Sequence, residues 1–388
     1  MLYFDHNATT FVAPEVADAM DAAVRQVYGN PSSTHRAGQA AREHLERARH
    51  VIAGAVHAGP AEIVLTSGGT ESNNLAIFGL LRQFSARRRH VVTTKIEHPS
   101  VTECCRQLER EGVEVTYVDV GREGVVDAAE IIHSIRPYTL LVSMMHANNE
   151  TGVVQPVQEI AQGVQALRVS GQQIFFHSDG VQAVGKTGVD VRTLGIDLYS
   201  MSAHKVFGPK GVGALFVRRG VPLPGVQFGG RHERERRAGT ENVPGVLAFA
   251  RALELCDGGY DGVRALRDYF ESELLRRIPD AVANGADAPR LPNTSNLLFR
   301  GVPAEAVVIA LDLRGMAVST GSACSSGSVE PSHVLLAMGR SRDEAKSSVR
   351  FSFGRYNTRD EVGQLIDAID SCVSRLRASR PVETELVT

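Results

Sequence analysis

The chain has 388 residues, enough for two domains with a buried core. Its composition is ordinary for a globular protein, and a net charge of −2 gives no reason to expect nucleic acid or an anionic membrane as the main partner. No apolar run approaches the roughly 20 residues of a membrane helix. Residues 1–6 do not resemble a signal peptide, so we expect a cytoplasmic protein.

Helical and strand-like stretches alternate over residues 1–220. The helical patterns are at 13–28, 38–58 and 71–81. The β-rich runs, several with helix-like segments between them, are at 63–66, 90–94, 113–118, 140–144, 174–177, 198–201 and 213–217. This alternation predicts an α/β domain with a mostly parallel sheet, whose ligand site lies at the carboxyl ends of the strands.

The pattern changes after residue 250. Helices are expected at 246–255, 263–278 and 359–376, and β-rich runs at 295–299 and 348–353. We therefore predict a large domain of residues 13–250 and a smaller α+β domain that combines residues 1–12 with residues 251–388. The polar tail, 378–388, is expected to be frayed.

The first motif with chemical potential is TSGGTE at 66–71, between a predicted strand and a predicted helix. Such a turn presents backbone N–H groups and a helix N-terminus to a phosphate. It fits neither the Walker spacing nor G-x-G-x-x-G, which disfavours ATP and NAD and leaves a smaller phosphate ligand open. A purely structural turn is the alternative.

Two later turns carry polar side chains that suit a ligand or only the turn itself. His98 lies in IEHPS at 96–100, where it could stack on a cofactor ring, move protons or be an ordinary loop histidine. Asn149 lies in NNETG at 148–152, a predicted turn after a strand. Neither motif decides between these interpretations alone.

Asp179 ends an apolar strand in FHSDGVQ at 176–182. A carboxylate there can keep a pyridine nitrogen protonated, which makes the ring of pyridoxal phosphate (PLP) an electron sink. A capping role for Asp179 is the alternative. Lys205, in SAHK at 202–205, follows another buried strand, where a partly desolvated amine is suited to a Schiff base and a surface lysine is the alternative. Together the two residues favour PLP.

Of the five cysteines, Cys324 has the most distinctive surroundings, STGSACSSGS at 319–328. A segment this small and polar is expected to be an exposed loop, which gives its thiol access to nucleophilic chemistry. An incidental thiol is the alternative. The odd count and the lack of a C-x-x-C pair argue against a disulfide framework or a structural zinc site, and we expect Cys256 and Cys372 to be buried.

Arg355 ends a strand-like alternation, RFSFGR at 350–355, and its fork of donors suits an amino-acid carboxylate. A solvated arginine at a strand end is the alternative.

In this order and spacing the motifs resemble one family, the cysteine desulfurases of the NifS and IscS type, within the class V aminotransferase branch of fold-type I PLP enzymes. The resemblance runs from about residue 3 to residue 377. Its strongest stretches are NPSS at 30–33 with His35, TSGGTESNN at 66–74, NNETG at 148–152, SAHK at 202–205 with GPKG at 208–211, RAGTEN at 237–242 and GSACSS at 321–326. It implies a large domain with a mostly parallel mixed sheet flanked by helices, plus the smaller α+β domain.

The resemblance also implies roles for matching positions around the cofactor ring. Lys205 matches the lysine that forms the Schiff base with PLP. Asp179 matches the partner of the pyridine nitrogen, and Gln182 matches the donor to the ring hydroxyl. His98 matches a residue stacked over the ring that is a candidate acid or base.

Further matches concern the phosphate, the substrate and the sulfur. The phosphate cup is implied at Gly69, Thr70, Ser202 and His204. Thr240 matches a phosphate contact from the other subunit, which implies a homodimer. Asn149, which is also expected to contact the cofactor, and Arg355 match residues that hold the substrate. Cys324, in a loop at about 319–330, matches the nucleophile that accepts sulfur.

The implied reaction converts L-cysteine to L-alanine and leaves a persulfide on Cys324 for a sulfur acceptor or scaffold protein, as in iron–sulfur cluster assembly or other thiolation. No metal site is expected, although a Cys324 persulfide could transiently bind an iron–sulfur cluster. A selenocysteine lyase or an aminotransferase of the same fold is one alternative, and a sulfur-relay platform that acts by protein interaction is another. Retention of Lys205, Asp179 and Cys324 speaks against a catalytically inactive scaffold.

The chain departs from the family pattern at His6, Gly180 and Arg231, where asparagine, alanine and glycine are common. We expect small effects, with His6 able to alter substrate access. The segment 376–381 also lacks the ending with which housekeeping members dock a scaffold protein. The sequence therefore leaves the acceptor open.

Overall fold

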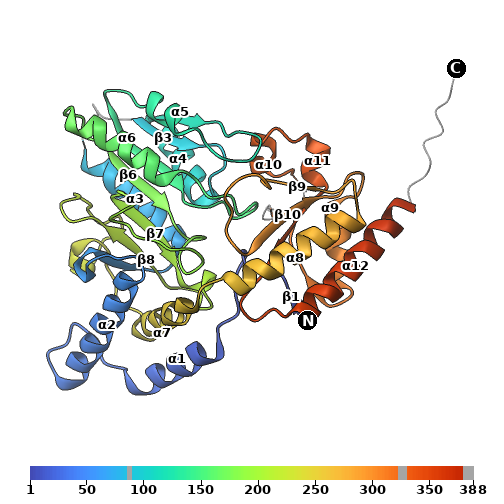
Figure 1. Ribbon diagram of the computed structural model, residues 1–388. Coiled ribbons are helices and arrows are strands. Elements are labelled where there is room, and N and C mark those ends of the chain that lie inside the picture. Colours follow the sequence, from blue (N-terminus) through green and yellow to red (C-terminus); the bar gives the residue numbers. More distant parts are fainter. Residues whose placement is uncertain (85–89, 322–329, 379–388) are drawn as a thin grey trace.

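The computed structural model describes residues 1–84, 90–321 and 330–378, which form a larger and a smaller body side by side (Figure 1). The larger body is built on a seven-stranded sheet of order β2-β8-β7-β6-β5-β3-β4. Its strands are β2 (Ile63–Thr66), β3 (His90–Thr94), β4 (Glu114–Val118), β5 (Thr139–Met145), β6 (Phe175–Asp179), β7 (Leu198–Ser202) and β8 (Gly213–Val217).

The sheet is mostly parallel. The strands β4, β3, β5, β6 and β7 pair in parallel, and β8 runs antiparallel to both β7 and β2. Every residue of β2, β3, β5, β7 and β8 is buried, as expected for strands that are covered on both faces. The predicted α/β class is therefore confirmed.

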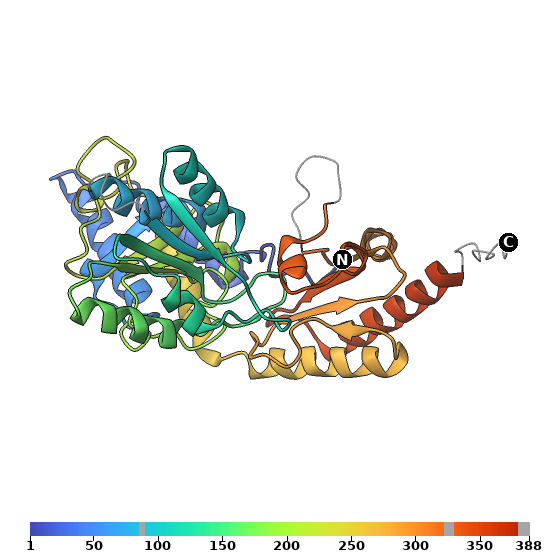
Figure 2. The ribbon, with the colours of Figure 1, turned by 90° about the horizontal axis from the view of Figure 1, so that it is seen from above.

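Helices cover both faces of this sheet, as the second view shows (Figure 2). On one face α3 and α4 contribute Leu75 and Leu108 to an apolar cluster with the strands. The other face carries a larger cluster that includes Leu45, Ile160 and Phe249. The helices of this body are α1 (Pro14–Gln26), α2 (Arg36–Gly54), α3 (Gly69–Gln83), α4 (Pro99–Arg110), α5 (Ala128–His133), α6 (Val157–Val169) and α7 (Val243–Glu254). Its 3-10 helices are η1 (Pro60–Glu62), η2 (Ala203–Lys205), η3 (Glu233–Glu235) and η4 (Leu255–Gly258).

The smaller body combines a three-stranded antiparallel sheet of order β12-β10-β9 with a parallel pair, β1-β11. Its strands are β1 (Leu2–Tyr3), β9 (Val282–Ala283), β10 (Thr294–Leu298), β11 (Met316–Ala317) and β12 (Ser348–Ser352). Its helices are α8 (Asp261–Arg277), α9 (Ala304–Asp312), α10 (His333–Ala337), α11 (Arg342–Lys346) and α12 (Arg359–Ala378). Both views show α8 and α12 beside this sheet.

The first residues of the chain belong to the smaller body. Leu2 pairs with Met316, and Phe4 packs in a core whose other buried members lie between residues 260 and 373. The backbone N–H of Asn7 then donates to Ser352 Oγ (2.9 Å). These contacts support the division that we propose from the sequence, with 13–250 in the large domain and 1–12 and 251–388 in the small one.

The predicted elements differ from the observed ones mainly at their ends. The helix expected at 38–58 is α2 (Arg36–Gly54), and the strand expected at 348–353 is β12 (Ser348–Ser352). The tail expected to be frayed lies outside the described residues beyond Ala378. Within the described ranges, no helix is both long and apolar enough to cross a membrane.

Candidate active site

A cavity of about 340 Å³ lies at the edge of the large sheet where β5, β6 and β7 end. The loops that follow parallel strands converge at this edge, which is the usual ligand site of such sheets. The predicted site residues that line the cavity are Gly69, Thr70, His98, Asn149, Asp179, Gln182, Ser202, His204 and Lys205. The predicted residues Thr240 and Arg355 do not line it.

The start of α3 forms one end of the cavity. Gly68 has a φ of +150°, a conformation that side chains rarely adopt, and a Cβ on Gly69 would lie 2.6 Å from Val181 Cγ2. Ser202 Oγ, at the end of β7, is buried and has no hydrogen-bond partner among the described residues. A helix N-terminus beside an unpartnered hydroxyl is suited to an anion such as a phosphate.

Asp179 is the last residue of β6 and is buried. Its carboxylate accepts hydrogen bonds from Asn73 Nδ2 (2.7 Å) and from the backbone N–H of Val181 (3.0 Å). These two donors come from α3 and from the turn after β6, so both elements fix the carboxylate. The carboxylate is therefore held in one orientation on the cavity wall.

Lys205 ends the short helix η2, which follows β7 directly. Its amine donates to the carbonyl oxygens of Asn7 and Ala8, the latter at 2.8 Å. Burial, with a further contribution from the Arg350 guanidinium, lowers the pKa of Lys205 to about 7. A large fraction of this amine is therefore uncharged near neutral pH, which makes it a competent nucleophile and base.

His98 is the N-cap of α4 and opens on the same cavity. The backbone N–H of Ser100 donates to its Nδ1 (3.1 Å), so the proton of the neutral ring lies on Nε2. The enclosure of the ring lowers the pKa of His98 below its usual value. His98 therefore offers the cavity a neutral imidazole with an N–H donor.

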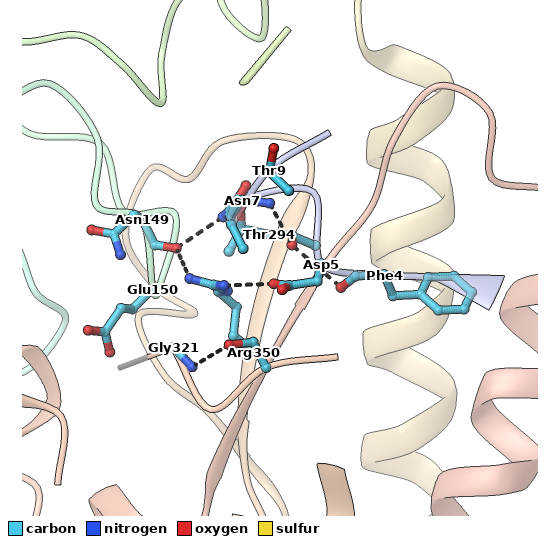
Figure 3. Close-up of polar contacts among 12 residues, drawn as sticks. Phe4, Asp5, Asn7, Thr9, Asn149, Glu150, Thr294, Gly321 and Arg350 are labelled. Atoms are coloured by element: carbon cyan, nitrogen blue, oxygen red, sulfur yellow. Dashed lines mark hydrogen bonds and ion pairs between the residues drawn. The ribbon is translucent and has the colours of Figure 1, made fainter. Parts of the chain in front are cut away.

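The wall opposite the large sheet is built around Arg350, from β12 (Figure 3). Its guanidinium donates to Asp5 Oδ1 (2.7 Å) and to the carbonyl oxygen of Asn149 (3.1 Å). That carbonyl also accepts from Asn7 Nδ2 (3.1 Å). Arg350 Nε is buried without a hydrogen-bond partner among the described residues, so this arginine keeps an unused donor.

Arg355 lies away from the cavity, contrary to the substrate contact predicted from the sequence. Its guanidinium donates to the carbonyl oxygen of Leu255 and to Cys256 Sγ (3.2 Å), and it lies 5.3 Å from the centre of the Phe207 ring. The physical reason is that β12 ends at Ser352, so the predicted alternation does not continue to Arg355. Arg350 is the arginine that lines the cavity.

Comparisons with known proteins agree with this geometry. The Aminotransferase class-V family model matches residues 2–365. The chain is 44% identical to the cysteine desulfurase IscS of Dictyoglomus turgidum, over 99% of this chain and 97% of that protein. The chain belongs to the cysteine desulfurases of aminotransferase class V.

Solved structures support the same family. A NifS-like protein superimposes with a TM-score of 0.90 at 36% identity and covers 97% of this cysteine desulfurase and 100% of its own chain. SspA, solved in complex with cysteine, has a TM-score of 0.82 at 35% identity over 92% of this chain and 100% of its own. Enzymes of this family generally depend on PLP.

The cavity-lining residues that the sequence analysis of this desulfurase did not select include Asn7, Asn73 and Arg350. Asn73 follows TSGGTE by two residues, so its position one helical turn behind the glycines is a signal that could have been used. Arg350 could have been preferred to Arg355, because it alternates with Ser348 and Ser352 on one face of the strand. Local sequence gives no comparable signal for Asn7.

Two further predicted site residues are Thr240 and Cys324. Thr240 is exposed and does not line it. Cys324 lies outside the described residues, so its position is not assigned; Ser319 and Gly321, which precede it, do line the cavity.

The three departures from the family pattern have different surroundings. His6 is buried against Phe207, with ring centres 5.4 Å apart, and burial lowers its pKa to about 4. A Cβ on Gly180 would lie 2.0 Å from the ring of Tyr199, so glycine at 180 makes room for that ring. The Arg231 side chain is exposed.

Proposed function

We propose that this desulfurase binds PLP, takes the sulfur from L-cysteine, releases L-alanine and holds the sulfur as a persulfide on Cys324. The observation that carries the proposal is the content of one cavity: a Lys205 amine with a pKa near 7, the fixed Asp179 carboxylate and an Arg350 guanidinium with an unused donor. Acid–base chemistry on a small zwitterionic substrate needs these three groups.

The residues of the cavity fit PLP. The start of α3, Ser202 and His204 would hold its phosphate, since Ser202 Oγ is a buried polar atom without a partner among the described residues. Asp179 would pair with the ring nitrogen, and Lys205 would hold the aldehyde carbon. When bound, the cofactor supplies an electron sink for carbanion chemistry at the substrate.

Arg350 is proposed to hold the carboxylate of L-cysteine. Its Nε–H is buried and unused within the described residues, while Asp5 and Asn149 hold the rest of the guanidinium. A guanidinium fixed in this way loses little conformational freedom when it binds a planar carboxylate. Asn149, whose side chain borders the cavity, would complete the binding of the substrate.

Lys205 and His98 are proposed to move the protons. An amine with a pKa near 7 can both take and return a proton at neutral pH. The neutral imidazole of His98 can donate from Nε2, because its Nδ1 is occupied by Ser100. In the net exchange the carbon–sulfur bond of the substrate breaks, a sulfur–sulfur bond forms on Cys324, and one thiol proton ends on the methyl group of alanine. No external oxidant or reductant is required.

The quaternary structure and partners follow from the same proposal. Thr240 is exposed and outside its own cavity, which supports a role at the phosphate of a second subunit and hence a homodimer. A sulfur-acceptor or scaffold protein would take the persulfide, and Cys324 could transiently bind an iron–sulfur cluster. A cytoplasmic location stays a prediction.

The test measures alanine and sulfide from L-cysteine with dithiothreitol, using the PLP-loaded protein. We expect equal amounts of the two products from the wild type. Cys324→Ser should lose both while still changing the visible absorbance when cysteine binds. Undiminished products from Cys324→Ser would remove Cys324 from the mechanism. Turnover of selenocysteine without turnover of cysteine would make the protein a selenocysteine lyase instead.

A further inference from the structure

One buried lysine, Lys186, has no part in the chemistry described above. It lies in the turn after β6, and its residue is only 5% exposed. Burying a lysine is costly unless its amine is well paired, and burial lowers the pKa of Lys186 well below the usual value. A buried amine this close to the cavity is therefore expected to have a specific role.

We propose that Lys186 is a positioning residue: it fixes the side-chain amide of Gln182 so that this amide presents N–H, not C=O, to the cofactor ring. The inference rests on the proposed function, because it assumes that PLP occupies the cavity that Gln182 lines.

The hydrogen bonds of Lys186 support this role. Its Nζ donates to Gln182 Oε1 (2.7 Å) and to Asn7 Oδ1 (3.2 Å). Gln182 Nε2 in turn donates to the backbone carbonyl of Asn7 (3.0 Å). Lys186 and Gln182 are four residues apart, so the short turn after β6 brings the two side chains together.

These contacts decide which way the Gln182 amide points. A carboxamide has an acceptor end and a donor end of nearly equal size, so its orientation follows from its neighbours. A carbonyl can only accept, so Asn7 requires the amide nitrogen of Gln182 on its side. Lys186 gives the amide oxygen a donor on the other side. One hydrogen of Nε2 is used by Asn7, and the second is left for the cavity.

Asn7 is itself held, which makes the arrangement rigid. Its Oδ1 accepts from Asn293 Nδ2 (3.0 Å), and its Nδ2 donates to Thr294 Oγ1 (2.8 Å). Loss of Lys186 would leave Gln182 Oε1 without that donor, which is unfavourable, and the amide would be held less firmly, with its contact to the Asn7 carbonyl remaining. Lys186 thus acts on the ring through Gln182, without touching the ring.

The first test titrates the visible absorbance of the bound cofactor against pH. A donor on the ring oxygen withdraws charge from that oxygen and so eases loss of the neighbouring proton, and removing the donor raises the pH midpoint. We expect Lys186→Met to raise the midpoint by about one unit, a tenfold change. Gln182→Met should raise it at least as far, and the double variant should match Gln182→Met alone.

Two controls accompany this titration. Lys186→Arg keeps N–H donors at this position and should keep the midpoint of the wild type. Lys346→Met changes an exposed lysine of α11 and should also leave it unchanged. A shift from Lys186→Met that persists in full on the Gln182→Met background would show a direct charge effect and overturn the proposal. A midpoint within 0.2 units of the wild type in Lys186→Met would overturn it equally.

A second test needs no cofactor. In the apoprotein we compare the thermal midpoints of Lys186→Met, Gln182→Met and the double variant. The two single losses should be non-additive, because both remove the same hydrogen bond. Strictly additive losses in the thermal midpoint would show that the hydrogen bond between Lys186 and Gln182 does not contribute to stability, which would overturn the proposal. Neither test uses substrate, so a protein that passes both yet releases no alanine from cysteine supports the role of Lys186 while the proposed function fails.

Discussion

The two walls of the cavity are built in different ways. The sheet wall, Gly69, Asp179, Ser202 and Lys205, consists of residues at the ends of strands or the start of a helix, each placed by its own element. The clamp wall, Asn7, Asn149, Ser319 and Arg350, is held by hydrogen bonds between segments far apart in the chain; Asn7 and Ser352, for example, are 345 residues apart. In the proposed function, the sheet wall would carry the cofactor chemistry and the clamp wall would carry substrate selection.

The largest effect is expected from a substitution in the sheet wall. Lys205→Ala removes the amine whose pKa lies near 7, and with it the nucleophile and base. We expect alanine release to fall by about 10³-fold or more, since both roles are lost together. Product analysis by mass spectrometry measures this directly. Cofactor retained after dialysis at an unchanged level would contradict a covalent role for Lys205.

The next change separates the clamp wall from the sheet wall. Arg350→Lys keeps a positive charge but loses the planar set of N–H donors of the guanidinium. We expect kcat/KM for cysteine to fall by about 100-fold, in line with truncating a buried charge pair. The cofactor absorbance should stay as in the wild type. Arg355→Met is the matched control, because Arg355 points at Leu255 and Cys256, and it should stay within about threefold. The reverse ranking would restore Arg355 as the substrate residue.

A third change tests packing beneath the sheet wall. Gly180→Ala would put a Cβ 2.0 Å from the buried Tyr199 ring, and we expect a loss of about 3 kcal/mol in the free energy of unfolding. Gly54→Ala, where no atom lies within 4 Å of the added Cβ, should be neutral or stabilising by about 0.5 kcal/mol. Urea unfolding of the apoprotein compares the two. Equal stability of both variants would show that Tyr199 is free to move.

The smallest effect concerns pH. The pKa of Lys205 falls from 10.5 to about 7 on folding, so between these values the unfolded state binds more protons than the native state. The contribution of Lys205 to the free energy of unfolding therefore rises with pH across this window. Comparing apoprotein stability at pH 7 and pH 9, we expect Lys205→Met to flatten that rise. An unchanged dependence of the free energy of unfolding on pH would mean that burial does not lower the pKa of Lys205.

The contrast between the sheet wall and the clamp wall also explains which parts of the site could be predicted from the sequence. Strands such as β5 and helices such as α3 follow from local patterns, and so do Asp179 and Lys205, which sit where strands end. Arg350 and Asn7 depend on how β12 and the first residues meet β10, as in the bond from Asn7 Nδ2 to Thr294 Oγ1. No local pattern encodes that meeting for Asn7, whereas the alternation of Arg350 with Ser348 and Ser352 is a local signal that favours Arg350 over Arg355.

The entry of the first residues into the smaller body bears on how the protein is made. Leu2 and Asn7 are synthesised before every strand of the large sheet, yet their partners Met316, Thr294 and Ser352 are synthesised after all of those strands. The sheet that supports the cofactor can form much earlier, because β2 to β8 are complete by residue 217. The nascent chain therefore carries an open half-site from residue 217 until β10, β11 and β12 have been made, and β1 cannot pair before Met316 is available.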